Sequence, residues 1–313
     1  DVQTGYVRQS WMRGAAGALY SLDSASADIA YRGFYKGYEA ASPRWGVTAY
    51  YRSPLIGPSQ WREPGYTVGR DAGTLIVSAP AALLDGDIDA AVYNGPRQFQ
   101  ARPADLQDGY LLGQTQVAQA AGLVVGHASG AGFEPPYDSR IVVGGEQGEP
   151  QAGTLWLDAA RLSRMGLGRL DLASAAGIAV TQDLTLAEGG RLQLVAPDVD
   201  IAATVTAHGG TVEATNVFDQ DQRWGTPDTL LDADGGARIR LREGAVLDLR
   251  GLRADAAQDA ASANRRGWID GGEARLAATG DVALAAGSRI DVSSGAAILD
   301  DGKVQGGKGG DVT

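Results

Sequence analysis

Short runs of alternating apolar and polar residues dominate the chain from residue 152 onward, and Gly, Asp, Asn or Ser separates each run from the next. A period of two puts every second side chain on the same face, which is the pattern of a β-strand buried on one side. The clearest runs cover residues 154–157, 169–172, 178–180, 184–186, 191–194, 199–201, 205–206 and 211–213. No helical period separates them, so we predict an all-β fold of many short strands without intervening helices.

The connections between these runs favour parallel stacking over hairpins. Two-residue Asn-Gly or Asp-Gly turns, which hairpins prefer, are largely missing between the runs. Gly189–Leu194 and Gly209–Ala214 instead repeat a Gly-Gly start and the same apolar register 20 residues apart. Related segments at Gly235–Ile239, Gly271–Leu276 and Gly309–Thr313 recur 36 and 38 residues apart, which we interpret as coils with inserted loops. The sequence therefore predicts a solenoid, in which each coil buries its apolar face against its neighbours.

Composition agrees with this fold and limits the expected partners. The 45 glycines are about twice the usage of ordinary domains, and glycine allows frequent turns. The formal net charge of −11 argues against a nucleic-acid partner, because phosphate binding needs a surplus of Lys and Arg. There is no cysteine, so the chain has neither disulfides nor thiolate chemistry. No apolar stretch approaches the ~20 residues of a membrane span, and we expect a chain that does not cross a membrane.

The sequence divides into an N-terminal segment and a long repetitive part. Residues 1–70 hold three of the six Trp and most of the Tyr but no sustained alternation, so we expect an irregular or partly helical, aromatic-rich layer packed on the solenoid. Residues 71–313 form the predicted parallel β-helix. Stretches that interrupt the alternation indicate excursions from it near residues 93–150, 217–232 and 253–270.

Several segments carry a resemblance to a known family. They are Gly65–Leu75, Ser78–Ala81, Asn94–Gln98, Gly287–Ala296 and Gly306–Val312. These segments resemble filamentous-haemagglutinin-type exoproteins of Gram-negative bacteria, which are large surface adhesins. The resemblance covers most of residues 65–313, whereas residues 1–64 are less distinctive.

The resemblance implies a fold, a route of export and a role. The fold would be a right-handed parallel β-helix, and the parent protein would use two-partner secretion through an outer-membrane transporter. The chain would then be a segment of a secreted or cell-surface virulence adhesin, an elongated scaffold that meets a receptor or glycan on a host or bacterial surface. The chain stops within Gly306–Thr313 just as a new strand begins, so we interpret it as a piece of a longer protein. The resemblance implies no catalytic residue and no cofactor.

Residues that could bind a metal or act as a nucleophile are sparse. His127 and His208 are the only histidines, and no Gly-x-Ser-x-Gly motif is present. The alternating aspartates of 85–89 lack the later Gly and Glu of a calcium loop. The oxygen-rich pair Asp219 and Asp221 is followed by the positively charged Arg223, where a calcium site would need another oxygen ligand. We therefore assign no metal site.

A polysaccharide-binding or polysaccharide-cleaving β-helix protein is the main alternative to a scaffold. Enzymes of this kind place paired carboxylates or an arginine beside a cleft on one exposed face. Arg238 and Arg240 alternate outward, and Asp248 could come near them one strand away. Such pairs are more often exposed ion pairs, so we predict that the chain is not an enzyme.

Two loops offer residues that could contact a partner. Trp224 lies beside Arg223, and Trp268 follows Arg265 and Arg266 closely. An aromatic ring next to a guanidinium can stack on sugar or fill a pocket on a protein. The simpler interpretation is that these rings fold over the flank of the solenoid, where insertions leave an apolar edge to cover.

Overall fold

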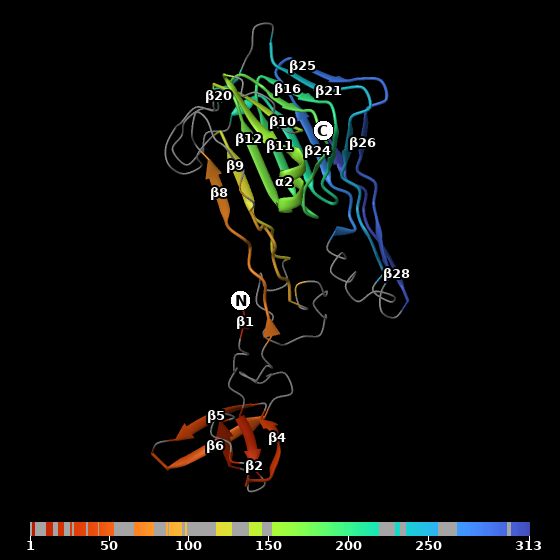
Figure 1. Ribbon diagram of the computed structural model, residues 1–313. Helices are drawn as coiled ribbons and strands as arrows, with labels where there is room; N and C mark the ends of the chain where they lie inside the picture. Colours follow the sequence, from red (N-terminus) through yellow and green to blue (C-terminus); the bar gives the residue numbers. More distant parts are fainter. Residues whose placement is uncertain are drawn as a thin grey trace. The chain divides into compact units, whose positions relative to one another are not determined.

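The computed structural model describes most of the repetitive part and portions of the N-terminal segment (Figure 1). The described residues are 2–3, 11–14, 18–21, 26, 28–35, 37–42, 44–52, 66–77, 86, 88–95, 98, 117–126, 138–145, 152–218, 229–231, 236–255, 268–298 and 302–313. The chain divides into two compact units, of which the first comprises residues 1–69 and 94–116 and the second comprises residues 70–93 and 117–313.

The first unit contains antiparallel strands where we expected an irregular or partly helical layer. Three small sheets pair β1 with β7, β3 and β4 with β2, and β5 with β6. The strands are β1 (Val2–Gln3), β2 (Trp11–Gly14), β3 (Leu19–Ser21), β4 (Tyr31–Tyr35), β5 (Gly37–Ser42), β6 (Val47–Arg52) and β7 (Tyr66–Thr67). Tyr is frequent in these strands and fits a pleated surface, which explains why an aromatic segment without clear alternation still forms strands. Packing of this segment on the solenoid stays a prediction.

The second unit is built on three parallel sheets with seven, six and four strands (Figure 1). The seven-stranded sheet has the order β29-β24-β18-β15-β12-β9-β8, the six-stranded sheet β11-β10-β13-β16-β21-β25, and the four-stranded sheet β14-β17-β22-β26. Each pairing within them is parallel. From β12 onward the chain passes from the seven-stranded to the six-stranded and then to the four-stranded sheet before it returns to the first. We call one such passage a coil.

The strand bounds follow the alternating runs of the sequence closely. The seven-stranded sheet comprises β8 (Thr74–Val77), β9 (Gly122–Val125), β12 (Arg169–Ala173), β15 (Arg191–Val195), β18 (Thr211–Thr215), β24 (Glu273–Ala277) and β29 (Asp311–Val312). The six-stranded sheet comprises β10 (Arg140–Gly144), β11 (Thr154–Asp158), β13 (Ile178–Val180), β16 (Asp198–Ile201), β21 (Arg238–Leu241) and β25 (Asp281–Leu284). The four-stranded sheet comprises β14 (Leu184–Thr185), β17 (Thr204–Thr206), β22 (Val246–Asp248) and β26 (Arg289–Asp291).

The core consists of inward side chains stacked in register from coil to coil. In the seven-stranded sheet Leu170, Leu192 and Val212 are Cα partners and are fully buried. The six-stranded sheet stacks Ile178 on Val199 in the same way. Because strands in a parallel pair keep their faces, a polar–apolar alternation of period two gives each coil one buried and one solvated side. The prediction of an all-β fold with parallel strands is confirmed.

Glycine pairs at the starts of strands allow the coils to approach closely. Gly210 precedes β18 and stacks on Gly190, which precedes β15; a Cβ at Gly210 would lie 2.1 Å from the Gly190 carbonyl oxygen. Gly272 and Gly310 repeat this contact before β24 and β29. The sequence repeat with Gly-Gly therefore marks equivalent positions of one sheet.

Gly235–Ile239 does not belong to that set, which corrects our interpretation of its 36-residue spacing from Gly271–Leu276. It leads into β21 of the six-stranded sheet, whereas the other Gly-Gly segments lead into the seven-stranded sheet. Gly-Gly followed by alternation can precede any strand, so the motif alone does not distinguish the sheets.

One helix lies between β11 and β12, where we expected none. α2 (Ala159–Met165) begins after Asp158, whose Oδ1 accepts a hydrogen bond from the Arg161 backbone N at 2.7 Å. It ends at Gly166, which has a φ of 62° and a backbone N–H bonded to the Ser163 carbonyl. The helix was missed because its seven residues span only two turns.

The predicted excursions contain strands of several kinds. β9 and β10 lie within residues 93–150 and pair inside the main parallel sheets. β19 (Val217–Phe218) and β20 (Thr229–Leu230) form an antiparallel pair apart from those sheets. A further three-stranded sheet joins β23 (Arg253–Asp255), β27 (Ala296–Ile298) and β28 (Val304–Gly306).

Candidate functional site

Of the five residues predicted to contact a partner, the structure describes only Trp268. Arg223, Trp224, Arg265 and Arg266 lie outside the described residues. Trp268 is half-buried, and its indole lies over a turn of the sheet: a Cβ at Gly189 would be 2.2 Å from a ring carbon. Glycine at position 189 makes room for this ring, so Trp268 covers the flank of the parallel stack. A ligand contact by these loops stays a prediction.

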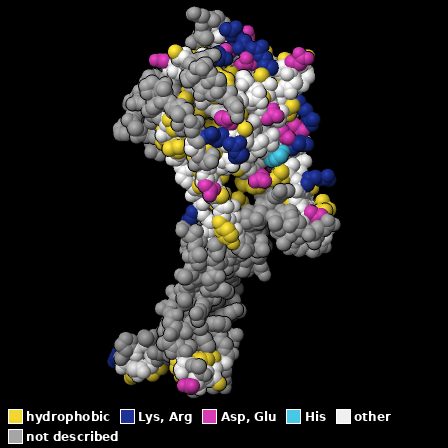
Figure 2. Space-filling view, in the orientation of Figure 1, with side chains coloured by type: hydrophobic (Ala, Val, Ile, Leu, Met, Phe, Trp, Pro, Cys, Tyr) yellow, Lys and Arg dark blue, Asp and Glu magenta, His cyan; other side chains and the backbone are white. Residues whose placement is uncertain are grey.

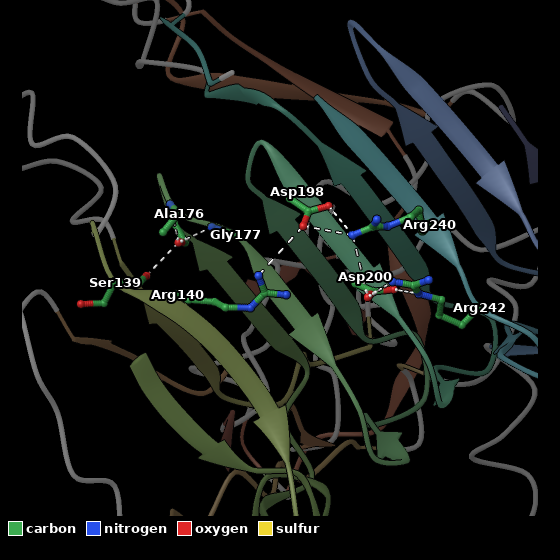
Figure 3. Close-up of polar contacts among 9 residues, drawn as sticks. Ser139, Arg140, Ala176, Gly177, Asp198, Asp200, Arg240 and Arg242 are labelled. Atoms are coloured by element: carbon green, nitrogen blue, oxygen red, sulfur yellow. Dashed lines mark hydrogen bonds and ion pairs between the residues drawn. The ribbon is translucent and has the colours of Figure 1, made fainter. Parts of the chain in front are cut away.

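The outward face of the six-stranded sheet carries a ladder of ion pairs (Figure 3). Arg240 Nη2 donates to Asp198 Oδ1 at 2.7 Å, and the Arg242 guanidinium binds both oxygens of Asp200 at 2.6 and 2.8 Å. Arg140 approaches Asp198 from the other side, with 4.0 Å between Nη1 and Oδ2. The parallel register produces this pattern, because Asp200 is the Cα partner of Arg240 and each arginine leans toward the carboxylate two positions earlier. The hydrogen bond with Asp200 raises the pKa of Arg242.

The structure does not bring Asp248 to Arg238 and Arg240, as the enzyme alternative required. Consecutive strands β21 and β22 enter different sheets, so residues one strand apart in sequence are not neighbours in space. Arg240 is instead bound to Asp198, and Asp248 is bound by Arg250. The expected arrangement failed because we treated consecutive runs as adjacent strands of one sheet.

A different pair of carboxylates comes together on the four-stranded sheet. Asp248 of β22 and Asp291 of β26 are Cα partners. Arg250 lies between them, with both guanidinium contacts to Asp248 at 2.7 Å and its Nε 3.8 Å from Asp291. Arg289 also binds Asp291, and His208 Nε2 lies 3.5 Å from Asp248 Oδ2. The sequence signal for this pair was the shared pattern Leu-Asp-Leu at 247–249 and Ile-Asp-Val at 290–292.

Both carboxylates of this pair are held in the ionised form. The Arg250 hydrogen bond lowers the pKa of Asp248 below its ordinary value, against the opposing effect of burial. Hydrogen bonding from Ser293 lowers the pKa of Asp291, and Arg289 and Arg250 add to the effect. A carboxyl that acts as general acid near neutral pH needs a raised pKa, because it must hold a proton. Asp248 and Asp291 therefore have the electrostatics of a structural ion-pair cluster.

Ion pairs also line the outward face of the seven-stranded sheet. Glu213 Oε2 accepts from Arg191 Nη2 at 3.2 Å, and Glu213 Oε1 lies 3.7 Å from Arg275 Nη1. Arg169 binds Asp171 one coil earlier. Positive and negative side chains are accordingly interspersed over the face of this unit in view (Figure 2). Each of the three sheets thus presents paired charges to solvent.

The described part of the chain holds no group of three or more His, Asp or Glu side chains arranged to bind a metal ion. Within the same residues, no helix has the length and apolar character needed to cross a membrane.

Comparisons with known proteins give no relative for this chain. No protein family, no curated protein and no solved structure matches it.

Proposed function

We propose that this chain is a segment of a secreted or surface-exposed filamentous adhesin of a Gram-negative bacterium, where it acts as an elongated scaffold for adhesion or effector presentation. The observation that carries the proposal is the passage of the chain through three parallel sheets in turn, with successive strands in register. Such a stack lengthens in one direction as coils are added, and its stability is a sum of neighbour contacts. Length and spacing are what a scaffold provides.

The finer fold within this proposal is a right-handed parallel β-helix. Three sheets visited in a fixed order are the expected faces of such a coil, and connections between parallel strands in one sheet are right-handed in most proteins. The resemblance of most of residues 65–313 to filamentous-haemagglutinin-type exoproteins supports the same fold. In that setting the parent protein would leave the cell through an outer-membrane two-partner-secretion transporter.

The outward charges support a scaffold more than an enzyme. Arginines on the outward faces of the three sheets are bound to carboxylates, and Asp248 and Asp291 are held ionised. Paired charges keep the faces of a long stack hydrated without a strong single-sign field. The partners we expect are a receptor or a glycan on a host or bacterial surface.

A glycan array read for both binding and cleavage tests the proposal. The adhesin hypothesis predicts saturable binding without cleavage, and a purely spacing role predicts neither. Cleavage would contradict the proposal and support the alternative of a polysaccharide-cleaving protein, for which the adjacency of Asp248 and Asp291 is the favourable observation. The Asp248→Asn, Asp291→Asn double variant would then lose the cleavage, whereas Asp198→Asn on another sheet would keep it.

A further inference from the structure

The hairpin of β5 and β6 in the first unit turns through an exposed tryptophan (Figure 1). The Ser42 carbonyl at the end of β5 accepts a hydrogen bond from the Trp45 backbone N at 3.1 Å. Gly46 follows with a φ of 60°, and Val47 begins β6 as the Cα partner of Ser42. The left-handed glycine directs the chain back into β6. We call Arg44, Trp45, Gly46 and Val47 the hairpin tip.

All four residues of the hairpin tip are exposed to solvent. Trp45 is 72% exposed and Val47 is 58% exposed, and a Cβ at Gly46 would have no atom within 4 Å. The guanidinium carbon of Arg44 lies 5.3 Å from the centroid of the Trp45 ring. Tryptophan is a highly buried residue on average, because its ring carries a large apolar area. The tip is therefore a small protruding apolar surface with one cation beside it.

Charge separates the first unit from the rest of the chain. Of the 27 basic and 38 acidic residues of the chain, nine and seven respectively belong to the first unit, residues 1–69 and 94–116. The first unit therefore has a small positive surplus, whereas the second unit accounts for the acidic character of the whole chain. Within Gly37–Arg52 the only acidic residue is Glu39, five residues before Arg44. A negatively charged surface can accordingly approach the hairpin tip without the repulsion that the second unit would produce.

The shape of the hairpin tip fits a lipid surface better than a sugar or a protein pocket. Sites for small ligands are concave, whereas this turn has open space beside Gly46. A stable protein interface buries about 1,200–2,000 Å² with matched shape, which is far more than one indole and one valine provide. A bilayer needs no matched shape. Tryptophan prefers the layer between headgroups and acyl chains, and a basic side chain beside it is attracted to anionic headgroups.

We infer that the hairpin tip inserts Trp45 and Val47 into the interfacial layer of an anionic lipid bilayer, with Arg44 at the headgroup phosphates. Insertion removes the apolar surface of both side chains from water, and Arg44 beside the ring can reach a phosphate. A single small anchor of this kind gives weak, reversible binding. The contact goes beyond the proposed scaffold role and does not depend on it, because it needs neither a glycan nor a protein receptor.

Flotation of the 313-residue chain with protein-free vesicles tests this inference. We expect binding to vesicles of phosphatidylcholine mixed with phosphatidylserine, and weaker binding to phosphatidylcholine alone or at high salt. Trp45→Ala is expected to lower the vesicle partition coefficient at least about tenfold. Arg44→Gln should lower it about fivefold, and only on the anionic vesicles. Brominated acyl chains should quench part of the tryptophan fluorescence, and Trp45→Phe should abolish that quenching because it removes the inserted indole.

Val47→Ala and Val304→Ala are a matched pair, because each removes the same two methyl groups from a strand residue that is 58% or 71% exposed. Val47→Ala should weaken vesicle binding about threefold, whereas Val304→Ala on β28 of the second unit should leave it unchanged. Circular dichroism checks the fold of each variant. Absence of binding to the anionic vesicles would overturn the inference, as would binding that Trp45→Ala and Val47→Ala leave intact. Attachment to cells that requires Trp45 but is lost after protease treatment of the cells, with none to vesicles, would identify a protein pocket instead.

Discussion

The middle coil and the last coil of the parallel stack have the same register but differ in what surrounds them. The middle coil contains β15, β16 and β17, and its inward side chains are buried by a neighbour on each side. The last coil contains β24, β25 and β26, and the inward side chains of β25 are about half exposed. Since the alternation is alike in both, burial here comes from neighbouring coils and not from the local sequence.

Truncation of an inward leucine should show this difference most strongly. Leu192→Ala in the middle coil removes a fully buried side chain and is expected to lower the free energy of unfolding by about 2–5 kcal/mol. Leu284→Ala in the last coil removes a half-exposed one, and we expect a loss below about 1 kcal/mol. Urea unfolding of both variants measures the two values. Equal losses would contradict the comparison.

The glycine stack provides the next largest effect. Gly210→Ala would place a Cβ 2.1 Å from the Gly190 carbonyl oxygen, so the two coils must separate. We expect a loss of about 1–3 kcal/mol in the free energy of unfolding. Gly309→Ala is the control, because no atom lies within 4 Å of the Cβ it would add. Equal melting temperatures of the Gly210→Ala and Gly309→Ala variants would contradict the close approach of the two coils at Gly210.

A buried asparagine joins the middle of the stack to the last coil. Asn216 is fully buried, and its Nδ2 donates to the Leu231 carbonyl at 2.8 Å and to the Thr279 hydroxyl at 2.7 Å. Its Oδ1 accepts from the Thr279 backbone N at 3.0 Å. Asn216→Leu leaves these groups without their partner, so thermal and urea unfolding should show a loss of about 1–3 kcal/mol. Gln305→Leu, at an exposed position of β28, should have almost no effect.

The smallest effect is expected from the paired aspartates, one in each of two successive coils. Their lowered pKa values stabilise the fold above the ordinary Asp pKa of about 3.9, and this contribution is lost as the pH falls below that value. Asp248→Asn should therefore cost no more than about 1 kcal/mol at pH 7, because Arg250 is half exposed, and less at pH 2 than at pH 7. Unfolding curves at the two pH values measure this, and a larger loss at pH 2 would contradict the assignment.

Much of the fold followed from period and spacing, because a strand buried on one face records its orientation in every second residue. The runs at 191–194 and 211–213 and their 20-residue offset correspond to β15 and β18 in direct register. Asp248 and Asp291 are likewise equivalent positions of two successive coils, but we did not use their spacing to predict that they are neighbours. Parallel register brings equivalent positions of successive coils together, so carboxylates that meet are separated by a whole coil in sequence.

The remaining features could not be read from alternation. Helix α2 is decided by its caps and by apolar contacts with the core, which a short segment does not show as a period. The sheet to which a run belongs depends on its place in the order of strands within a coil. The long interval without clear alternation between residues 217 and 237 makes that place impossible to count from the sequence. Asp248 was expected near Arg240 because consecutive runs were treated as adjacent strands of one sheet, whereas β21 and β22 lie in different sheets.

Disulfide formation between engineered cysteines tests the parallel, in-register stack most directly, because the chain has no cysteine of its own. Gln193 and Glu213 are Cα partners on the outward face of β15 and β18, and neighbouring strands lie about 4.8 Å apart. The Gln193→Cys, Glu213→Cys double variant should therefore oxidise within the monomer. In the Gln193→Cys, Thr211→Cys control the two positions are offset by two residues, or about 8 Å, beyond the reach of a disulfide of about 7 Å. Oxidation of the first pair alone is the predicted result, and preferential oxidation of the control pair would contradict the stack.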